Sequence, residues 1–165
     1  MNSQILIRPD YRKDEEKNEW VIYHRWELHY DRHEYTPENV EIVSNAIRDK
    51  LTPKMLSTKY REENRTNPLF GHCYHSTQAL YYFMDTDNLA PHCGRDHRGI
   101  IHWWLKDKNE IIDVTEDSYD ANNLPPYDVG KKSKWFGWKE RVHKRTLELM
   151  NSVQPTSQLM SVNLS

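Results

Sequence analysis

The sequence predicts a mixed α+β fold, in which a helix packs on a small antiparallel sheet within one domain. Residues 73–84 carry apolar side chains at helical spacing, which indicates an amphipathic helix. Residues 100–105 alternate between two apolar series, as expected of a strand that is covered on both faces. The polar turn at 106–109 leads into a second β-rich run, 110–115, so we expect these two runs to form a hairpin.

The first thirty residues predict β structure interrupted by a charged loop. Residues 4–7 suit a short strand, which we expect to end near Pro9. The charged run 10–19 is predicted to be a solvated loop. Residues 20–30 are rich in β-branched and aromatic side chains, and we interpret them as a second strand.

Two helices are expected before Cys73. Thr36 followed by Pro37 is a clear helix start, with the threonine as N-cap and the proline at the first helical position. Apolar residues then recur at helical spacing as far as Leu51. The run 52–63 repeats the Thr-Pro start and predicts a shorter helix. Both should pack beside the helix that begins at Cys73.

The last third of the chain predicts a loop, a helix and a tail. Two prolines and an Asn-Asn pair predict a long ordered loop over 116–134. Helical spacing returns over 135–150. Residues 151–165 lack charge and periodicity, and we expect a flexible C-terminal tail. The predicted domain therefore spans residues 1–150.

Composition limits the partners. A chain of 165 residues is long enough for one domain with a core, and too short for two comfortable ones. Because the net charge is only -2, we expect neither nucleic acid nor a membrane as a partner. The sequence has no apolar run of membrane-spanning length and no signal-peptide core, which predicts a cytoplasmic protein. With two cysteines in a reducing compartment, no disulfide framework is expected.

Cys73, His102 and Asp113 occur in the chain order of a nucleophile, a base and an orienting acid. Cys73 falls in the first turn of its predicted helix, where free backbone N–H groups and the positive end of the helix dipole stabilise a thiolate. The hairpin places His102 and Asp113 on neighbouring strands, where they can share one face. An imidazole needs such a partner to fix its tautomer. The alternative for Cys73 is a small buried hydrophobic residue.

The run NPLFGHC at 67–73, with TQAL at 77–80, resembles the N-P-x-x-G-x-C helix start of the small YunG-like family. The HWW and IDVT steps that contain His102 and Asp113 resemble the second half of that family. The order Cys, His, Asp, with an aromatic residue after the histidine, is similar to the transglutaminase-like branch of the papain-like fold. The resemblance covers about residues 38–125. It departs from the family pattern at His72, where glutamine is expected, and in the loop that carries Cys93 and His97.

The resemblance implies a papain-like (transglutaminase-like) domain that acts on acyl groups through Cys73, His102 and Asp113, as a peptidase, deamidase or transglutaminase. A protein or peptide substrate is implied, and no cofactor or metal is expected. A papain-like enzyme would place an oxyanion-hole donor at Asn67. His97, in a polar loop beside two glycines, is expected to line the entrance, and Trp104 to line the substrate-binding part of the site.

Two other functions remain open from the sequence. Cys73 with His75, and Cys93 with His97, offer the four ligands of a zinc-binding module. The chain could also be a catalytically inactive papain-like protein that serves in an interaction.

Overall fold

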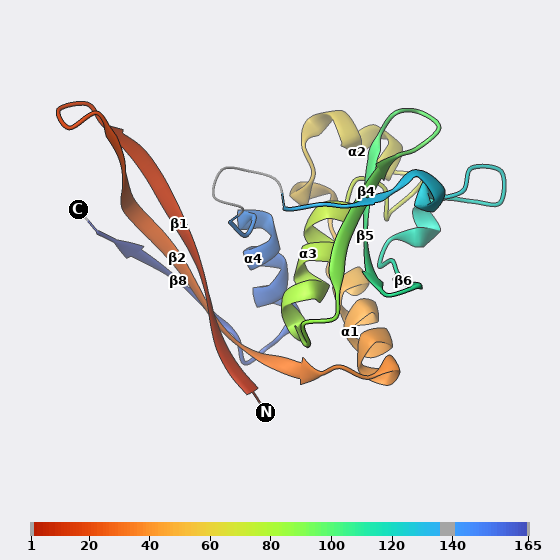
Figure 1. The fold of residues 1–165 in the computed structure, drawn as a ribbon, viewed down its shortest axis with the longest axis horizontal. Helices are drawn as coiled ribbons and strands as arrows, with labels where there is room; N and C mark the ends of the chain where they lie inside the picture. The colour runs from red at the N-terminus through yellow and green to blue at the C-terminus, as the bar shows by residue number, and fades with distance from the viewer. Residues whose placement is uncertain (1, 136–140, 165) are drawn as a thin grey trace.

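Two largely antiparallel sheets flank a group of helices in the computed structural model, which describes residues 2–135 and 141–164 (Figure 1). The chain forms one mixed α+β domain. The expected fold class is therefore confirmed at the level of α+β. In the described part of the chain, no helix is long and apolar enough to cross a membrane.

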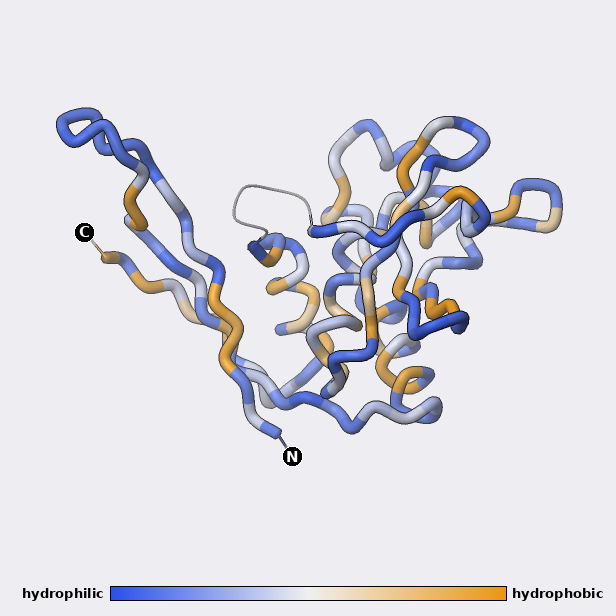
Figure 2. The backbone as a smooth tube through the Cα atoms, in the orientation of Figure 1, coloured by the Kyte–Doolittle hydropathy of each residue, from blue (hydrophilic) through white to orange (hydrophobic). Residues whose placement is uncertain are grey.

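The first sheet is a long ribbon built mainly from the two ends of the chain. Strand β1 (Asn2–Asp14) pairs antiparallel with β2 (Glu19–Glu34), and β8 (Gln158–Asn163) pairs antiparallel with the other side of β2. The two-residue strand β3 (Met84–Asp85) adds a short parallel pairing at the end of β2. The turn between β1 and β2 is hydrophilic and lies away from the helices (Figure 2).

Two expectations for this ribbon were wrong. Strand β1 does not end at Pro9 but continues through it to Asp14, with a register irregularity between Asp10 and Tyr11. An edge strand tolerates proline because the missing N–H faces no partner strand. Residues 151–165 are not a frayed tail, since β8 lies there and pairs with β2.

The second sheet carries the predicted hairpin. Its strand order is β6-β5-β4-β7, with β5 at Ile101–Asp107 and β6 at Glu110–Ile112. The hairpin prediction is confirmed, and Lys108 has the positive φ of 55° that a tight turn requires. The segment with Cys93 and His97, expected as a loop, instead contains strand β4 (Ala90–Arg95), which pairs with β5. The outer strand β7 has two residues, Lys131–Lys132.

The helices confirm two of the three starts expected in the first half of the chain. Helix α1 (Pro37–Asp49) has Thr36 as its N-cap, whose hydroxyl accepts from the Asn39 N–H. The second Thr-Pro start gives a 3₁₀ turn at Pro53–Met55, and α2 (Thr58–Asn64) follows it. Helix α3 begins, as predicted, at Cys73 and ends at Phe83.

The last helix begins later than the sequence indicated. Helix α4 spans Lys144–Val153, whereas the expected helix covered 135–150. Residues 136–140 of that expectation lie outside the described residues. The loop expected over 116–134 contains two 3₁₀ turns, Glu116–Ser118 and Tyr127–Val129.

Helix α3 is the centre of the packing. It contacts β5, α1 and α4, and α4 in turn contacts β2 and β8 (Figure 1). Fully buried aliphatic and aromatic side chains fill these contacts. They include Leu28, Ile47, Leu80, Phe83, Trp103, Leu105, Leu147 and Leu149. Because α3 and β5 both lie in this core, the residues at their surfaces are held in a fixed relation to each other.

Candidate active site

The start of α3 positions Cys73. Gly71 has a positive φ of 87°, which a residue with a side chain rarely adopts, and a Cβ there would lie 3.0 Å from Leu56 Cδ2. This turn brings the chain into α3 so that Cys73 is the first helical residue, and His72 provides no side-chain cap. The first backbone N–H groups of a helix have no partner inside it. The Cys73 Sγ lies 3.7 Å from the carbonyl oxygen of Ile101.

His102 and Asp113 form a buried pair, as the hairpin predicted. The His102 Nε2 and the Asp113 Oδ2 are 2.6 Å apart, and their side chains are 2% and 0% exposed. Cys73 and His102 line the same cavity and interact electrostatically. Burial lowers the pKa of His102, but the hydrogen bond to Asp113 and the electrostatic interaction with Cys73 outweigh burial and raise the pKa to about 9. The structure therefore brings all three predicted residues together.

Asp113 has its hydrogen-bonding capacity well satisfied. Its Oδ2 also accepts from the hydroxyl of Tyr127 at 2.7 Å, and its Oδ1 accepts from the Thr115 N–H at 3.1 Å. Burial and the charge of Asp113 raise the pKa of Tyr127, so its hydroxyl keeps its proton. A buried carboxylate is stable only with such partners. Tyr127 was not predicted, because nothing in its local sequence distinguishes it.

Aromatic rings fix the orientation of the His102 ring. The indole of Trp104 stacks on it, with centroids 5.9 Å apart and planes at 26°. The ring of Tyr119 meets it edge-on at 4.8 Å, and the Tyr119 hydroxyl donates to Asp96 at 2.8 Å. Trp104 is 1% exposed, so it supports His102 from behind and does not line the substrate side as expected.

A cavity of about 600 Å³ opens onto Cys73 and His102. Its walls are largely apolar and aromatic, and include Leu69, Phe70, Ile100 and Tyr119. Two arginines, Arg95 and Arg145, also line it, whereas no carboxylate does so among the described residues. An apolar cavity with a few convergent polar groups is typical of a small-molecule or peptide site.

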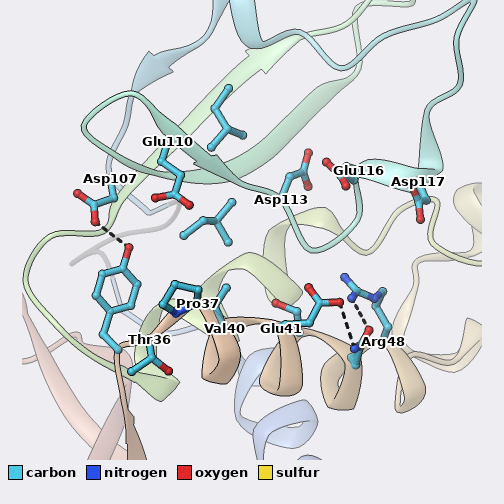
Figure 3. Close-up of a pocket in the computed structure, with 15 residues that line it drawn as sticks. Thr36, Pro37, Val40, Glu41, Arg48, Asp107, Glu110, Asp113, Glu116 and Asp117 are labelled. Carbon is cyan, nitrogen blue, oxygen red and sulfur yellow. Dashed lines mark hydrogen bonds between the residues drawn. The ribbon is translucent and has the colours of Figure 1, made fainter.

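A second cavity, of about 670 Å³, has the opposite character. In Figure 3, Asp113, Glu116 and Asp117 lie opposite Glu41 and Arg48 of α1. Burial, with the charges of Asp113 and Asp117, raises the pKa of Glu116. Asp113 lines this cavity and not the first, so its pairing with His102 connects the two.

Two buried histidines, His72 and His75, lie close to Cys73 in the sequence. The Nδ1 of His72 and the Nε2 of His75 are 3.0 Å apart, and the two residues are 0% and 4% exposed. Burial is the main cause that lowers the pKa of His72 to about 4 and of His75 to about 3. Both rings are therefore neutral near pH 7.

Asn67 and His97 lie apart from Cys73. They line a separate cavity of about 280 Å³, and the Asn67 amide donates to the Ser118 carbonyl at 2.8 Å. This amide is therefore engaged elsewhere, and the structure does not bring it to Cys73. The first-turn N–H groups of α3 are the nearest donors for an oxyanion.

The four residues of the zinc alternative are not gathered into one site. Cys93, on β4, is within hydrogen-bonding distance of Ser133, with Sγ and Oγ 3.1 Å apart. His97 lines the cavity that holds Asn67. Over residues 2–135 and 141–164, no group of three or more His, Cys, Asp or Glu side chains is arranged to hold a metal ion.

Two residues that line the cavity at Cys73, His143 and Arg145, were not predicted as site residues. They come from the start of α4, which is distant in sequence from the motif around Cys73, and no local pattern marks them. The fold and the site together thus define an α+β domain in which a buried His102–Asp113 pair and the half-buried Cys73 lie beside a cavity. No family model, curated protein or solved structure matches the chain.

Proposed function

We propose that the protein is a thiol-dependent hydrolase or acyltransferase, with Cys73 as nucleophile, His102 as base and Asp113 as the residue that orients His102. The buried contact of 2.6 Å between His102 and Asp113, beside the cavity that Cys73 and His102 both line, carries this proposal. The Nε2 of His102 is bound to Asp113, which leaves Nδ1 for the thiol. In nucleophilic catalysis of this kind, one imidazole nitrogen exchanges a proton with the nucleophile, while the other is held by the orienting acid.

The reaction would proceed in two steps. The Cys73 thiolate attacks the carbonyl carbon of an amide or ester, and the first-turn N–H groups of α3 stabilise the negative oxygen. The C–N or C–O bond then breaks as the His102 imidazolium protonates the leaving group, which yields a thioester. Water or an amine, deprotonated by His102, attacks the thioester and restores the thiol. Hydrolysis, deamidation and acyl transfer differ only in the group that enters or leaves.

The papain-like and YunG-like resemblance of the motif around Cys73 supports the same class. A protein or peptide is the natural donor for this chemistry, and the partly apolar cavity of about 600 Å³ can hold an extended side chain. The inactive interaction protein is the second candidate. It predicts that Cys73 reacts no faster than an ordinary thiol.

Alkylation and acylation of Cys73 test the proposal. Iodoacetamide labelling is followed at Cys73 and Cys93 by peptide mapping, so that Cys93 serves as the internal reference. Acetyl transfer from p-nitrophenyl acetate measures formation and turnover of the thioester. We expect Cys73 to react faster than Cys93, and His102→Asn to slow Cys73 at least about tenfold at neutral pH.

The matched control is His97→Asn, which removes an exposed histidine that lines a separate cavity, and it should leave both rates unchanged. If Cys73 and Cys93 react equally and His102→Asn has no effect, the proposed catalysis is wrong. Alkylation of Cys73 no faster than that of Cys93, with no release of nitrophenolate, would favour the inactive interaction protein.

A further inference from the structure

The start of α4 is locked onto the helix that carries the nucleophile. Gln78, a fully buried residue of α3, accepts from the His143 backbone N–H at 2.9 Å and from the Thr146 hydroxyl at 2.8 Å. His143 and Arg145 therefore stand in a fixed relation to Cys73, and both line the cavity onto which Cys73 opens. Such rigid positioning is what a substrate-binding group needs.

Arg145 differs from most arginines of this chain. Six described arginines have a guanidinium nitrogen within 4.0 Å of a carboxylate oxygen: Arg8, Arg25, Arg32, Arg65, Arg98 and Arg141. Arg145 is half-buried, and its guanidinium has no carboxylate partner within the described ranges. A guanidinium presents a planar fork of donors that suits a carboxylate.

His143 presents a further donor beside Arg145. The Arg145 backbone N–H donates to the His143 Nδ1 at 3.0 Å, so in the neutral ring the proton lies on Nε2. Burial, and then the charge of Arg145, lower the pKa of His143 to about 4, and the ring is neutral near pH 7. The same charge also lowers the pKa of His75, after burial and the two neighbouring histidines. The effect of Arg145 on the pKa values of His143 and His75 indicates a positive electrostatic potential on the α4 side of the cavity.

We propose that the acyl group accepted at Cys73 carries a carboxylate, and that Arg145 binds this carboxylate with support from the His143 Nε2–H. The absence of Asp and Glu from the described lining leaves the positive charge of Arg145 available to a ligand. The substrate class is thus an anionic acyl donor with some apolar length, such as an acidic peptide. This inference rests on the proposed function for the identity of the nucleophile.

A pair of alkylating reagents tests the charge preference directly. Iodoacetate and iodoacetamide have the same leaving group and nearly the same size, and differ by one carboxylate. The measured quantity is the rate of iodoacetate at Cys73 divided by the rate of iodoacetamide at Cys73. We expect Arg145→Gln to lower this ratio about tenfold, as expected for the loss of one charge-assisted hydrogen bond. Arg145→Lys, which keeps the charge, should restore part of it.

Lys144→Gln is the matched control, because it removes the same charge one residue away. The Lys144 ammonium lies over the Trp26 ring and 3.9 Å from Glu148, and Lys144 does not line the cavity. We expect it to change the ratio less than about twofold. If Arg145→Gln changes the ratio no more than Lys144→Gln does, the inference is overturned.

A measurement on the unmodified protein does not depend on the folding of any variant. Glutarate at millimolar concentration should slow the iodoacetamide labelling of Cys73, whereas the neutral glutaramide should not. Equal protection by both compounds, or none by either, would also overturn the inference. Failure of the proposed function looks different, since His102→Asn would then leave the iodoacetamide rate at Cys73 unchanged.

Discussion

Replacing Asp113 by asparagine separates a catalytic role from a structural one, because the change keeps the shape of the side chain and removes its charge. The carboxylate accepts from His102, Tyr127 and the Thr115 N–H, and its side chain is wholly buried. An amide accepts hydrogen bonds only at its oxygen. At least one of the three donors would then face the amide N–H and lose its acceptor.

The expected effect of Asp113→Asn on the free energy of unfolding follows from the pKa of His102, which is about 9 compared with an ordinary value of 6.5. At about 1.4 kcal/mol for each pKa unit, this difference is worth roughly 3 kcal/mol in favour of the imidazolium. The folded-state pKa is raised, so this stabilisation is complete below pH 6.5 and is lost as the pH rises through 9. Asp113 is the first of the interactions that oppose burial, so we expect the pKa of His102 to fall in its absence.

Two assays measure the effect of Asp113→Asn on stability and on the reactivity of Cys73. The free energy of unfolding in urea should differ between the natural protein and Asp113→Asn by up to roughly 3 kcal/mol at about pH 6, and the difference should shrink above about pH 9. Acylation of Cys73 at neutral pH should fall about a hundredfold. Asp117→Asn removes an exposed carboxylate that lines the same acidic cavity, and it should change neither quantity.

Acylation of Asp113→Asn at the natural rate, together with a stability difference that does not change with pH, would refute the reasoning. Asp113 would then be a structural residue that caps the end of the hairpin, worth about 1 kcal/mol.

Three further predictions follow from the surroundings of the site. Gly130→Ala should lower the free energy of unfolding by about 1–3 kcal/mol in urea, because its Cβ would lie 2.1 Å from the Trp104 ring; a change below the error of the measurement would contradict this. Tyr127→Phe should slow thioester formation about three- to tenfold and lower the melting temperature, because the triad carboxylate loses one donor. Because the pKa values of His72 and His75 are lowered in the folded state, these two residues do not destabilise the protein above pH 6.5, and they lower the free energy of unfolding as the pH drops toward 4. His75→Phe should make this pH-dependent fall smaller in urea titrations.

The sequence was informative where structure depends on local chemistry. The Thr36 cap, the start of α3 at Cys73 and the hairpin from β5 to β6 each follow from a few adjacent residues, and each is present. The hairpin also explains why His102 and Asp113 could be placed together. A short turn fixes the register of two strands, and the register fixes which side chains share a face.

The missed elements depend on partners distant in the sequence. Strand β4 contains proline, histidine and glycine, and it becomes a strand because its backbone pairs with β5. Strand β8 likewise has neither charged residues nor a periodic pattern that would predict a strand. It is ordered because it pairs with β2, which lies more than a hundred residues earlier in the sequence. Backbone hydrogen bonds in a sheet place few demands on side-chain identity, so such strands leave a weak signal.

The same distinction applies within the site. The reacting groups come from α3 and the hairpin, where short-range patterns place them, whereas Arg145 reaches the cavity through α4, held by the long-range contacts of Gln78. The triad geometry depends on contacts between α3 and β5 in the core. The charge of the cavity depends instead on the packing of α4 against α3. Under the proposed function, we therefore expect a substitution at Arg145 to change which acyl group is bound while the contact between His102 and Asp113 stays intact, so that reactivity and substrate preference can be altered separately.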